Sequence, residues 1–399
     1  MTRRERVLNA VNFRPVDRTP KDLGGMNSTG ISAFAYPNLV KALGLPYRRP
    51  RIHDTGQMLA MPDIDILDAL DCDVVHAAMD SHTNAFPEPE KWKPYGFNGR
   101  LDALVRQPEA YKVHEDGTIT MNETLSMPPA SHVFDSAHGG QPLDLTGELP
   151  HPDLNDMKKS LSAQVFTDER IRAVEDYLKR VRSSTDRAVM FNGLQYGLGY
   201  PHGIAAWSML CLTDPDYVKA RHDIVIEHAI TQMKRLLPAI APYVDIIMAS
   251  SDDQGTQQSS ILPPDTYREL YTPYYRRAND AAHRLAPDSK IFLHSCGAIY
   301  DLIDSVIEGG FDILNPVQWS AGKHGFREWK DKCRGRISLW GGGVNTQTTL
   351  PLGTVNDVKR EAAEAASYLS GDSGFVFCAI HNLLAEIPPE KIIAMYQAV

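Results

Sequence analysis

Residues 290–318 have the sequence KIFLHSCGAIYDLIDSVIEGGFDILNPVQ and contain one complete strand–helix–strand unit. The apolar run Lys290–His294 predicts a short buried strand, and Phe311–Asn315 predicts a second one. Between them, Ala298–Glu308 has the periodicity of an amphipathic helix and is followed by two glycines. A strand, a crossover helix and a further strand form the unit from which parallel sheets are built.

The same alternation extends over the rest of the chain. Apolar, β-rich runs predict eight strands: Thr19–Leu23, Cys72–His76, Ala188–Asn192, Val244–Ala249, Lys290–His294, Phe311–Asn315, Arg336–Trp340 and Gly374–Ala379. Helices are predicted over Ile31–Leu43, Asp168–Arg182, Asp214–Leu237, Pro264–Leu285, Ala298–Glu308, Val355–Ser370 and Pro389–Val399. Eight such units favour a closed (β/α)8 barrel of the TIM type over an open sheet. We therefore predict one α/β barrel domain over residues 1–399.

One long interval departs from this alternation. It lies between the second and third predicted strands, and much of it, residues 77–156, is rich in Pro and Gly. Within it, Asp116-Gly117 separates Ala110–Glu115 from Thr118–Asn122, which predicts a β-hairpin. We expect an insertion over about residues 77–160 that packs on one rim of the barrel, since long intervals of this kind are usually functional loops or lids.

Composition excludes several classes of partner. The net charge is −9 and there is no basic run, so a nucleic-acid partner is not expected. No stretch approaches the roughly 20 apolar residues of a membrane span. The N-terminus MTRRERVLNAVNF lacks the apolar core of a signal peptide, so we expect a cytoplasmic protein. The cysteines number five, an odd and sparse set that argues against a disulfide framework.

Functional side chains in a parallel barrel gather where strands end. His294 and Cys296 end the fifth predicted strand, two residues apart, so both side chains point the same way. Cys378 ends the eighth strand, near the same mouth by topology. One imidazole and two thiolates match a catalytic zinc site that keeps a fourth position open. His-x-Cys is a short pattern that is common by chance, so the spacing alone is also compatible with buried strand ends whose cysteines are incidental.

Other polar and aromatic groups follow the remaining strands. Asp252 and Asp253 are candidate acid/base groups, with a helix cap as the structural alternative. His381 is either a ligand-contacting group or a histidine satisfied within the last loop. Asn315, Gln318 and Trp340 are candidate substrate contacts, although Trp340 is equally suited to a turn that caps the barrel. Gly341–Gly343 do not form a dinucleotide fingerprint.

Several segments together resemble the uroporphyrinogen decarboxylase superfamily. They are TRRERVLNAVNFRPVDRTPKDLGG at the start, then DDQGTQ, LPPDTYRELYTPYYRRANDAA, HSCGAIYDLIDSVIEGGFDILNPVQ, LWGGGVNTQTTLPLGT and IHNLLAEIPPEKIIAMYQA towards the end. The true decarboxylases resemble one another in an Arg-rich segment of the type PxWxMRQAGR, which handles the carboxylates of the substrate. Here residues 23–29 read LGGMNST, without arginine. The resemblance is therefore closer to the corrinoid-linked methyltransferase branch, such as the methylcobamide:coenzyme M methyltransferases.

That resemblance implies a function. The zinc ligands of the branch follow His-x-Cys…Cys, which His294, Cys296 and Cys378 match. The implied enzyme is a zinc-dependent methyltransferase that exchanges a methyl group between a corrinoid and either a thiol or a methylated small molecule. The D-x-H-x-x-G corrinoid motif is absent, so a separate corrinoid protein is the expected partner. Two alternatives stay open: a metal-free lyase acting on a smaller acid through Asp252, Asp253 and His381, and a non-catalytic binding barrel.

Overall fold

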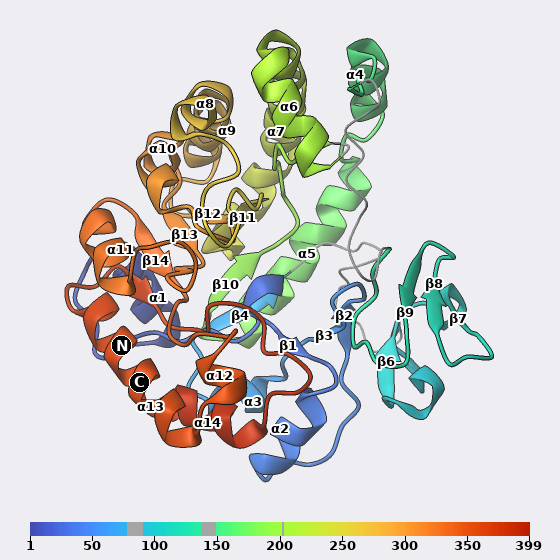
Figure 1. Ribbon diagram of the computed structural model, residues 1–399, viewed down its shortest axis with the longest axis vertical. Coiled ribbons are helices and arrows are strands. Elements are labelled where there is room, and N and C mark those ends of the chain that lie inside the picture. Colours follow the sequence, from blue (N-terminus) through green and yellow to red (C-terminus); the bar gives the residue numbers. More distant parts are fainter. Residues whose placement is uncertain (78–90, 137–148, 202) are drawn as a thin grey trace.

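The computed structural model describes residues 1–77, 91–136, 149–201 and 203–399 (Figure 1). Its main sheet has seven parallel strands in the order β15-β14-β13-β12-β11-β10-β4. In chain order these strands are β4 Val74–Ala77, β10 Ala188–Phe191, β11 Ile246–Ser251, β12 Lys290–His294, β13 Ile313–Asn315, β14 Ser338–Trp340 and β15 Phe375–Val376. The seven strands coincide with seven of the eight predicted runs.

The eighth position of the barrel is filled by a segment without a ladder of its own. Thr19–Leu23, predicted as the first strand, forms only one parallel bridge, between Lys21 and Phe377. The amide of Asp22 donates to the carbonyl of Phe377 at 2.8 Å, and on the other side Asp73 donates to the carbonyl of Lys21 at 2.7 Å. The segment is therefore bonded to both edges of the sheet, and the TIM-type barrel is confirmed.

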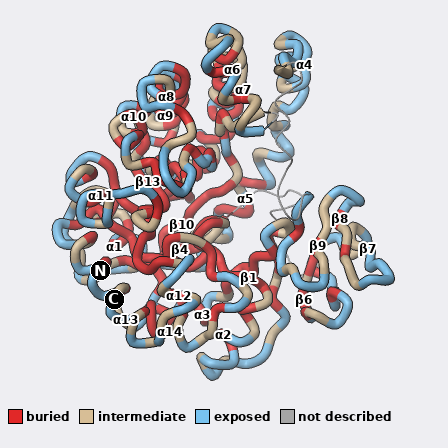
Figure 2. Tube along the Cα trace, in the orientation of Figure 1, coloured by how far each residue is buried: buried red, intermediate tan, exposed pale blue. Residues whose placement is uncertain are grey.

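Helices surround the sheet in the order expected for such a barrel. They are α1 Arg3–Val11, α2 Tyr36–Ala42, α3 Ile64–Ala69, α4 Leu154–Ser162, α5 Asp168–Ser184, α6 Ile204–Thr213, α7 Pro215–Ile240, α8 Pro264–Leu270, α9 Thr272–Leu285, α10 Ile303–Glu308, α11 Phe326–Cys333, α12 Thr349–Leu352, α13 Val355–Ser370 and α14 Pro389–Gln397. Figure 2 shows the buried trace concentrated in the strands and on the inner sides of the helices. Among the described residues, no helix combines the length and the apolar character that crossing a bilayer requires.

Three helix predictions differ from the structure. The helix predicted over Ala298–Glu308 is α-helical only from Ile303, after a 3-10 turn at Tyr300–Leu302. The helix predicted over Ile31–Leu43 begins only at Tyr36, because Ile31–Ser32 forms β1 and pairs with β3, Leu59–Ala60. β3 pairs in turn with β2, Ile52–Asp54, in a small antiparallel sheet. The helix predicted over Pro264–Leu285 is divided into α8 and α9 at Tyr271, two residues before Pro273, whose ring nitrogen cannot donate to the preceding turn.

The interval predicted as an insertion contains two small antiparallel sheets, which lie beside β2 and β3 in Figure 1. The predicted hairpin is confirmed as β7 Tyr111–Val113 paired with β8 Ile119–Met121. The other strands are β5 Lys93–Tyr95, β6 Ala103–Val105 and β9 Leu125–Met127. Residues 78–90 and 137–148 of the predicted insertion lie outside the described residues, and its role as a lid stays a prediction.

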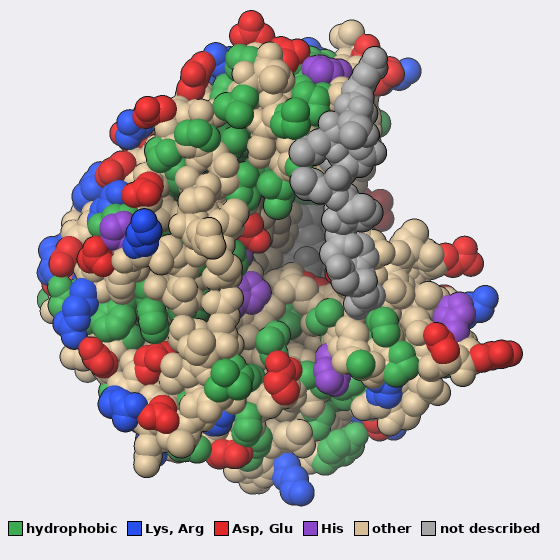
Figure 3. Space-filling view, in the orientation of Figure 1, with side chains coloured by type: hydrophobic (Ala, Val, Ile, Leu, Met, Phe, Trp, Pro, Cys, Tyr) green, Lys and Arg blue, Asp and Glu red, His purple; other side chains and the backbone are tan. Residues whose placement is uncertain are grey.

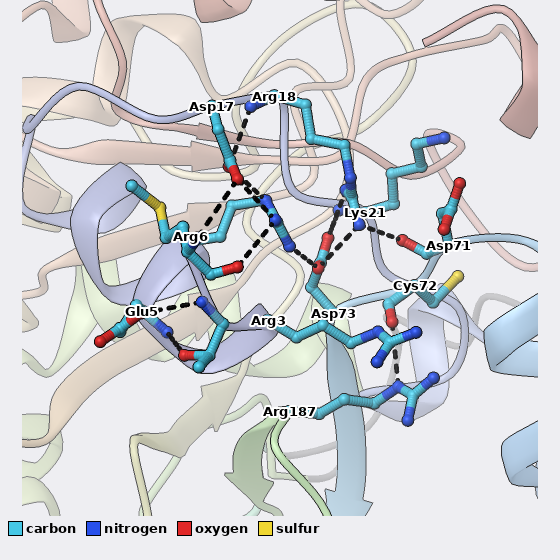
Figure 4. Close-up of polar contacts among 12 residues, drawn as sticks. Arg3, Glu5, Arg6, Asp17, Arg18, Lys21, Asp71, Cys72, Asp73 and Arg187 are labelled. Atoms are coloured by element: carbon cyan, nitrogen blue, oxygen red, sulfur yellow. Dashed lines mark hydrogen bonds and ion pairs between the residues drawn. The ribbon is translucent and has the colours of Figure 1, made fainter.

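A buried ion cluster ties α1 to β4. Figure 4 shows Arg6 and Arg18 on either side of Asp73, with Asp17 beyond them. Asp73 is fully buried and accepts from Arg6 at 2.7 Å and from Arg18 at 2.7 Å. Its second oxygen also accepts from the amide of Lys21 at 2.9 Å, on the segment that closes the barrel. One carboxylate therefore joins the first helix, the closing segment and the sheet.

The buried carboxyl of Asp22 is expected to make stability depend on pH. Burial raises its pKa to about 6, although Trp340 donates to it at 2.9 Å. Because the folded pKa lies above the ordinary value, the stabilisation by the protonated form is complete below about pH 4 and is lost as the pH rises through about 6. Asp22→Asn should flatten the dependence of the free energy of unfolding on pH over this range, by up to about 3 kcal/mol. Urea unfolding at a series of pH values measures this, and profiles that coincide for wild type and variant contradict it.

Candidate metal centre

Side chains from two loops at the carboxyl ends of strands converge on one point. Within the described residues, His294, Cys296 and His381 form a group of three whose ligand atoms all lie within 4.8 Å of one another. His294 is the last residue of β12, Cys296 follows it by two residues, and His381 lies on the loop after β15. A TIM barrel places its active site at this end.

Asn315 sets the tautomer of His294. The Asn315 amide nitrogen donates to the carbonyl of Trp340 at 2.9 Å, so its oxygen faces His294. That oxygen lies 2.6 Å from His294 Nδ1, which therefore carries the proton and donates. Nε2 is left with its lone pair, 3.2 Å from Cys296 Sγ. A histidine held in this way by a partner on its other nitrogen is typical of metal ligands.

The loop that carries Cys296 is hydrogen-bonded to the loops after β11 and β13. The amide of Cys296 donates to Asp253 at 2.8 Å, and the amide of Gly297 donates to Gln318 at 2.6 Å. Gly297 has a φ of +92°, and Gly255 packs directly against it. A Cβ on Gly297 would lie 2.3 Å from the carbonyl of Gly255, so only glycine permits this approach.

Gly297→Ala should therefore displace Cys296 and weaken metal binding at least tenfold, because the two loops must separate to admit the methyl group. Gly335→Ala is the matched control, since Gly335 also has a positive φ, of +67°, but a Cβ there would meet no atom within 4 Å. The control should lose about 1 kcal/mol of stability and retain the metal. Competition with a chromogenic chelator measures the affinity, and equal affinities in the two variants would count against this account of the loop contact.

The three candidate ligands are uncharged when no metal is bound. Burial lowers the pKa of His381 to about 4 and also lowers the pKa of His294, so both imidazoles keep a lone pair at neutral pH. Burial raises the pKa of the Cys296 thiol, and Asp253 raises it further. A divalent cation at the group would favour the thiolate and release this proton.

Cys378, predicted as the third ligand, lies outside this group. It is 1% exposed and belongs to the apolar cluster inside the barrel, with Val376 and Trp340. Burial raises its thiol pKa well above the ordinary value. Within the described residues, the third member of the group is His381, which the sequence placed among the catalytic candidates; a ligand role for Cys378 stays a prediction.

The two adjacent aspartates have different surroundings. Asp252 is buried, accepts from the amide of Leu198 at 2.7 Å and is bonded to the hydroxyl of Tyr275. Asp253 is exposed, and its oxygen lies 3.5 Å from Nε2 of His294. Of the two, Asp253 reaches the metal group, whereas Asp252 fastens neighbouring loops.

The three residues predicted to contact substrate also lie in different surroundings. Trp340 is fully buried in the barrel interior, where its ring meets Phe292 at 5.5 Å between centroids, and it does not line the cavity described below. Asn315 is buried behind His294. Gln318 borders the cavity described below. Ser28, which the sequence did not single out, places its hydroxyl 3.1 Å from Nε2 of His294; its position just after the first predicted strand was the available signal.

A cavity of ≈ 520 Å³ opens beside the metal group. This volume is in the range of sites for small molecules. The lining residues are Asp253, Gly255, Thr256, Gln257, Cys296, Gly297, Gln318, Thr346, Gln347, Ile380, His381, Asn382 and Leu384. None of these is Lys or Arg, and in Figure 3 the basic side chains gather towards the periphery of the view. The lining suits a small, uncharged molecule more than a polycarboxylate.

Comparisons with known proteins agree with this architecture. A family model described as Uroporphyrinogen decarboxylase (URO-D) matches residues 196–399. The fold is similar to that of a methyltransferase from Methanosarcina mazei, with a TM-score of 0.56 and 16% identity over 100% of this chain and 98% of that chain. No curated protein sequence matches the chain.

Other solved structures are more distant. An endo-1,4-β-xylanase from Caldicellulosiruptor owensensis has a TM-score of 0.33 at 9% identity, over 58% of this chain and 76% of that chain. A GH53 catalytic domain from Ignisphaera aggregans has a TM-score of 0.32 at 12% identity, over 96% and 99%. Scores this low say nothing further about this chain.

Proposed function

The chain belongs to the uroporphyrinogen decarboxylase (URO-D) family, and from this premise we propose that it is a zinc-dependent, corrinoid-linked methyltransferase. The observation that carries the proposal is the convergence of His294, Cys296 and His381 beside a cavity. The methyltransferase that shares the fold over the whole chain supports the same branch of the family. The described residues that line the cavity include no Lys or Arg, which supports a substrate other than a porphyrinogen with its many carboxylates.

The donor set fits zinc. Two imidazole nitrogens and one thiolate sulfur are ligands that Zn²⁺ prefers, and three protein ligands leave one position for the substrate. With a single thiolate the bound ion keeps a net charge of +1, whereas the two thiolates predicted from the sequence would cancel its charge. When bound, zinc supplies a Lewis acid that polarises a sulfur or oxygen atom of the substrate.

The protein's own residues have assignable roles. His294, Cys296 and His381 would hold the metal, and Asn315 would keep His294 in the liganding tautomer. Asp253 faces both the cavity and the metal group, so we assign to it the proton that a thiol loses or an alcohol gains. The methyl group would pass between the small molecule and a corrinoid presented by a partner protein.

The alternative lyase depends on Asp252, Asp253 and His381 acting together. Asp252 is buried against Leu198 and Tyr275 and does not line the cavity, so this trio is not assembled. The methyltransferase is therefore the function that the geometry supports best.

Visible spectroscopy of cobalamin tests the reaction directly. We expect the zinc-loaded protein to demethylate methylcobalamin with one member of a thiol panel, or to methylate reduced cobalamin from one member of a panel of methyl ethers, methylamines and methyl thioethers. Either activity should disappear on chelation and return with zinc, and both assays should be repeated with the partner corrinoid protein. If no spectrum changes even then, or if metal-free protein decarboxylates uroporphyrinogen, the proposed function is wrong.

A further inference from the structure

Two histidines near the metal centre have buried ring nitrogens without hydrogen-bond partners among the described residues. His53 on β2 is 1% exposed, and neither of its ring nitrogens has a partner within the described part of the chain. His76 on β4 lies beside it, with ring centroids 4.7 Å apart, and its Nε2 is likewise buried without a described partner. Buried polar atoms cost stability unless they are hydrogen-bonded. A bound molecule that hydrogen-bonds to these ring nitrogens would therefore be stabilising.

A third unpartnered atom belongs to the loop that reaches the metal centre. Asn27 donates to Asp54 at 2.7 Å, next to His53, and its own buried carbonyl oxygen has no partner among the described residues. The following residue, Ser28, lies 3.1 Å from Nε2 of His294. Asn27, which is hydrogen-bonded to the residue after His53, is thus one residue along the chain from a contact with the candidate ligand His294.

A second set of hydrogen bonds links the surroundings of His53 to the cavity beside the metal group. Gln57 donates to Asp54 at 3.2 Å and accepts from Asn382 at 2.8 Å. Asn382 follows His381 in the chain and lines the cavity. Hydrogen bonds therefore run from the neighbourhood of His53 to the cavity wall.

The two rings are neutral, and each offers hydrogen-bonding groups to a bound molecule. Burial lowers the pKa of His53 to about 4 and of His76 to about 3, so both rings are neutral at pH 7. Nδ1 of His76 lies 3.3 Å from the carbonyl of Gly25 and 3.2 Å from the amide nitrogen of Asn192, which itself donates to that carbonyl at 2.9 Å. Nε2 of the neutral ring is therefore an acceptor when Nδ1 donates to Gly25, and a donor when Nδ1 accepts from Asn192. A neutral His53 adds one donor and one acceptor.

We propose that His53, His76 and Asn27 form a polar subsite that binds a neutral hydroxyl group of the substrate, an alcohol or a phenol. The assignment of this ligand to the substrate rests on the proposed function, whereas binding at the subsite does not. A hydroxyl both accepts and donates, so it pairs with the N–H of His53 and with an acceptor on His76 or Asn27.

Charged ligands fit these groups less well. A carboxylate only accepts, so the carbonyl oxygen of Asn27 would face its oxygens without a hydrogen between them. An ammonium group only donates, so it would face the N–H of His53. In either case a charge would be buried beside two rings that resist protonation.

Binding to the purified, zinc-loaded chain tests the subsite with probes that share one ring. We expect benzyl alcohol to bind at least tenfold more tightly than benzoate or benzylammonium. We expect His53→Leu to weaken benzyl alcohol binding at least tenfold, and His53→Gln, which keeps a donor and an acceptor, to retain binding within about threefold. The Tm of His53→Leu should equal or exceed that of wild type, because an unpartnered polar group is removed.

The matched control is His222→Leu. His222 is fully buried and also has an unpartnered Nε2 among the described residues, but it packs on α7 against Tyr271, away from the subsite. Benzyl alcohol binding should not change in this variant. A crystal structure with benzyl alcohol should show its hydroxyl on His53 and His76.

Several outcomes overturn the subsite. They are equal binding of the three probes, no binding of benzyl alcohol, unchanged binding by His53→Leu, a lower Tm of that variant, or a crystal structure with only an ordered water at the two histidines. Methyl transfer is measured separately on the same preparations. Methyl transfer without alcohol binding would refute the subsite but not the proposed function. Alcohol binding without methyl transfer would refute the proposed function but not the subsite.

Discussion

Purified Cys296→Ser protein is expected to bind zinc at least a hundredfold more weakly than wild type and to lose methyl transfer in proportion. Cys296 contributes the one thiolate of the group, and the serine hydroxyl is a poor ligand at neutral pH. His381→Ala should have a comparable effect, because it removes a second of the three ligands. Zinc affinity from chelator competition, with circular dichroism to confirm folding, measures both.

Cys378→Ser is the decisive comparison, since a ligand set built on two cysteines requires it to lose zinc as well. The buried position of Cys378 leads us to expect zinc affinity within a factor of about three of wild type. Asn315→Ala, which frees the ring of His294, should fall between these extremes, about 10- to 100-fold weaker. Full zinc retention in His381→Ala together with loss in Cys378→Ser would reverse the assignment.

Asp73→Ala is expected to lower the free energy of unfolding by about 3–5 kcal/mol. The substitution leaves Arg6, itself buried, without its main interior partner and removes an acceptor from the amide of Lys21. Removing one member of a buried ion cluster is costly because the remaining charge stays out of water. Chemical unfolding at pH 7 measures the change.

An exposed ion pair provides the control for this prediction. Arg268 and Glu308 lie 2.9 Å apart with about half of each side chain exposed. Glu308→Ala should cost about 1 kcal/mol or less, because solvent screens the pair. A loss below about 1 kcal/mol in Asp73→Ala would mean that Arg6 and Arg18 find other partners.

The order of strands and helices could be predicted because it depends on local pattern. Seven apolar runs, such as Lys290–His294, are buried on both faces and stand between amphipathic helices, so their hydrophobic periodicity alone identifies them. The first run, Thr19–Leu23, could be recognised as extended. Its pattern did not show that it would form only a single β-bridge with the neighbouring strand. Its role depends on hydrogen bonds to Phe377 and Asp73, which are distant in the chain.

The pairing of His294 with Cys296 was also local, since residues two apart on an extended strand share a face. Cys378 was placed near the same mouth because it ends the eighth strand, but that topology says nothing about depth along the barrel axis. Cys378 lies in the interior with Trp340, and the loop beyond it returns His381 to the metal group. That return depends on Asn382, whose side chain bonds to Gly30 and Gln57 from the other end of the chain. Contacts of this kind form only when the barrel closes. The sequence pattern alone therefore could not tell whether Cys378 or His381 would lie beside His294 and Cys296.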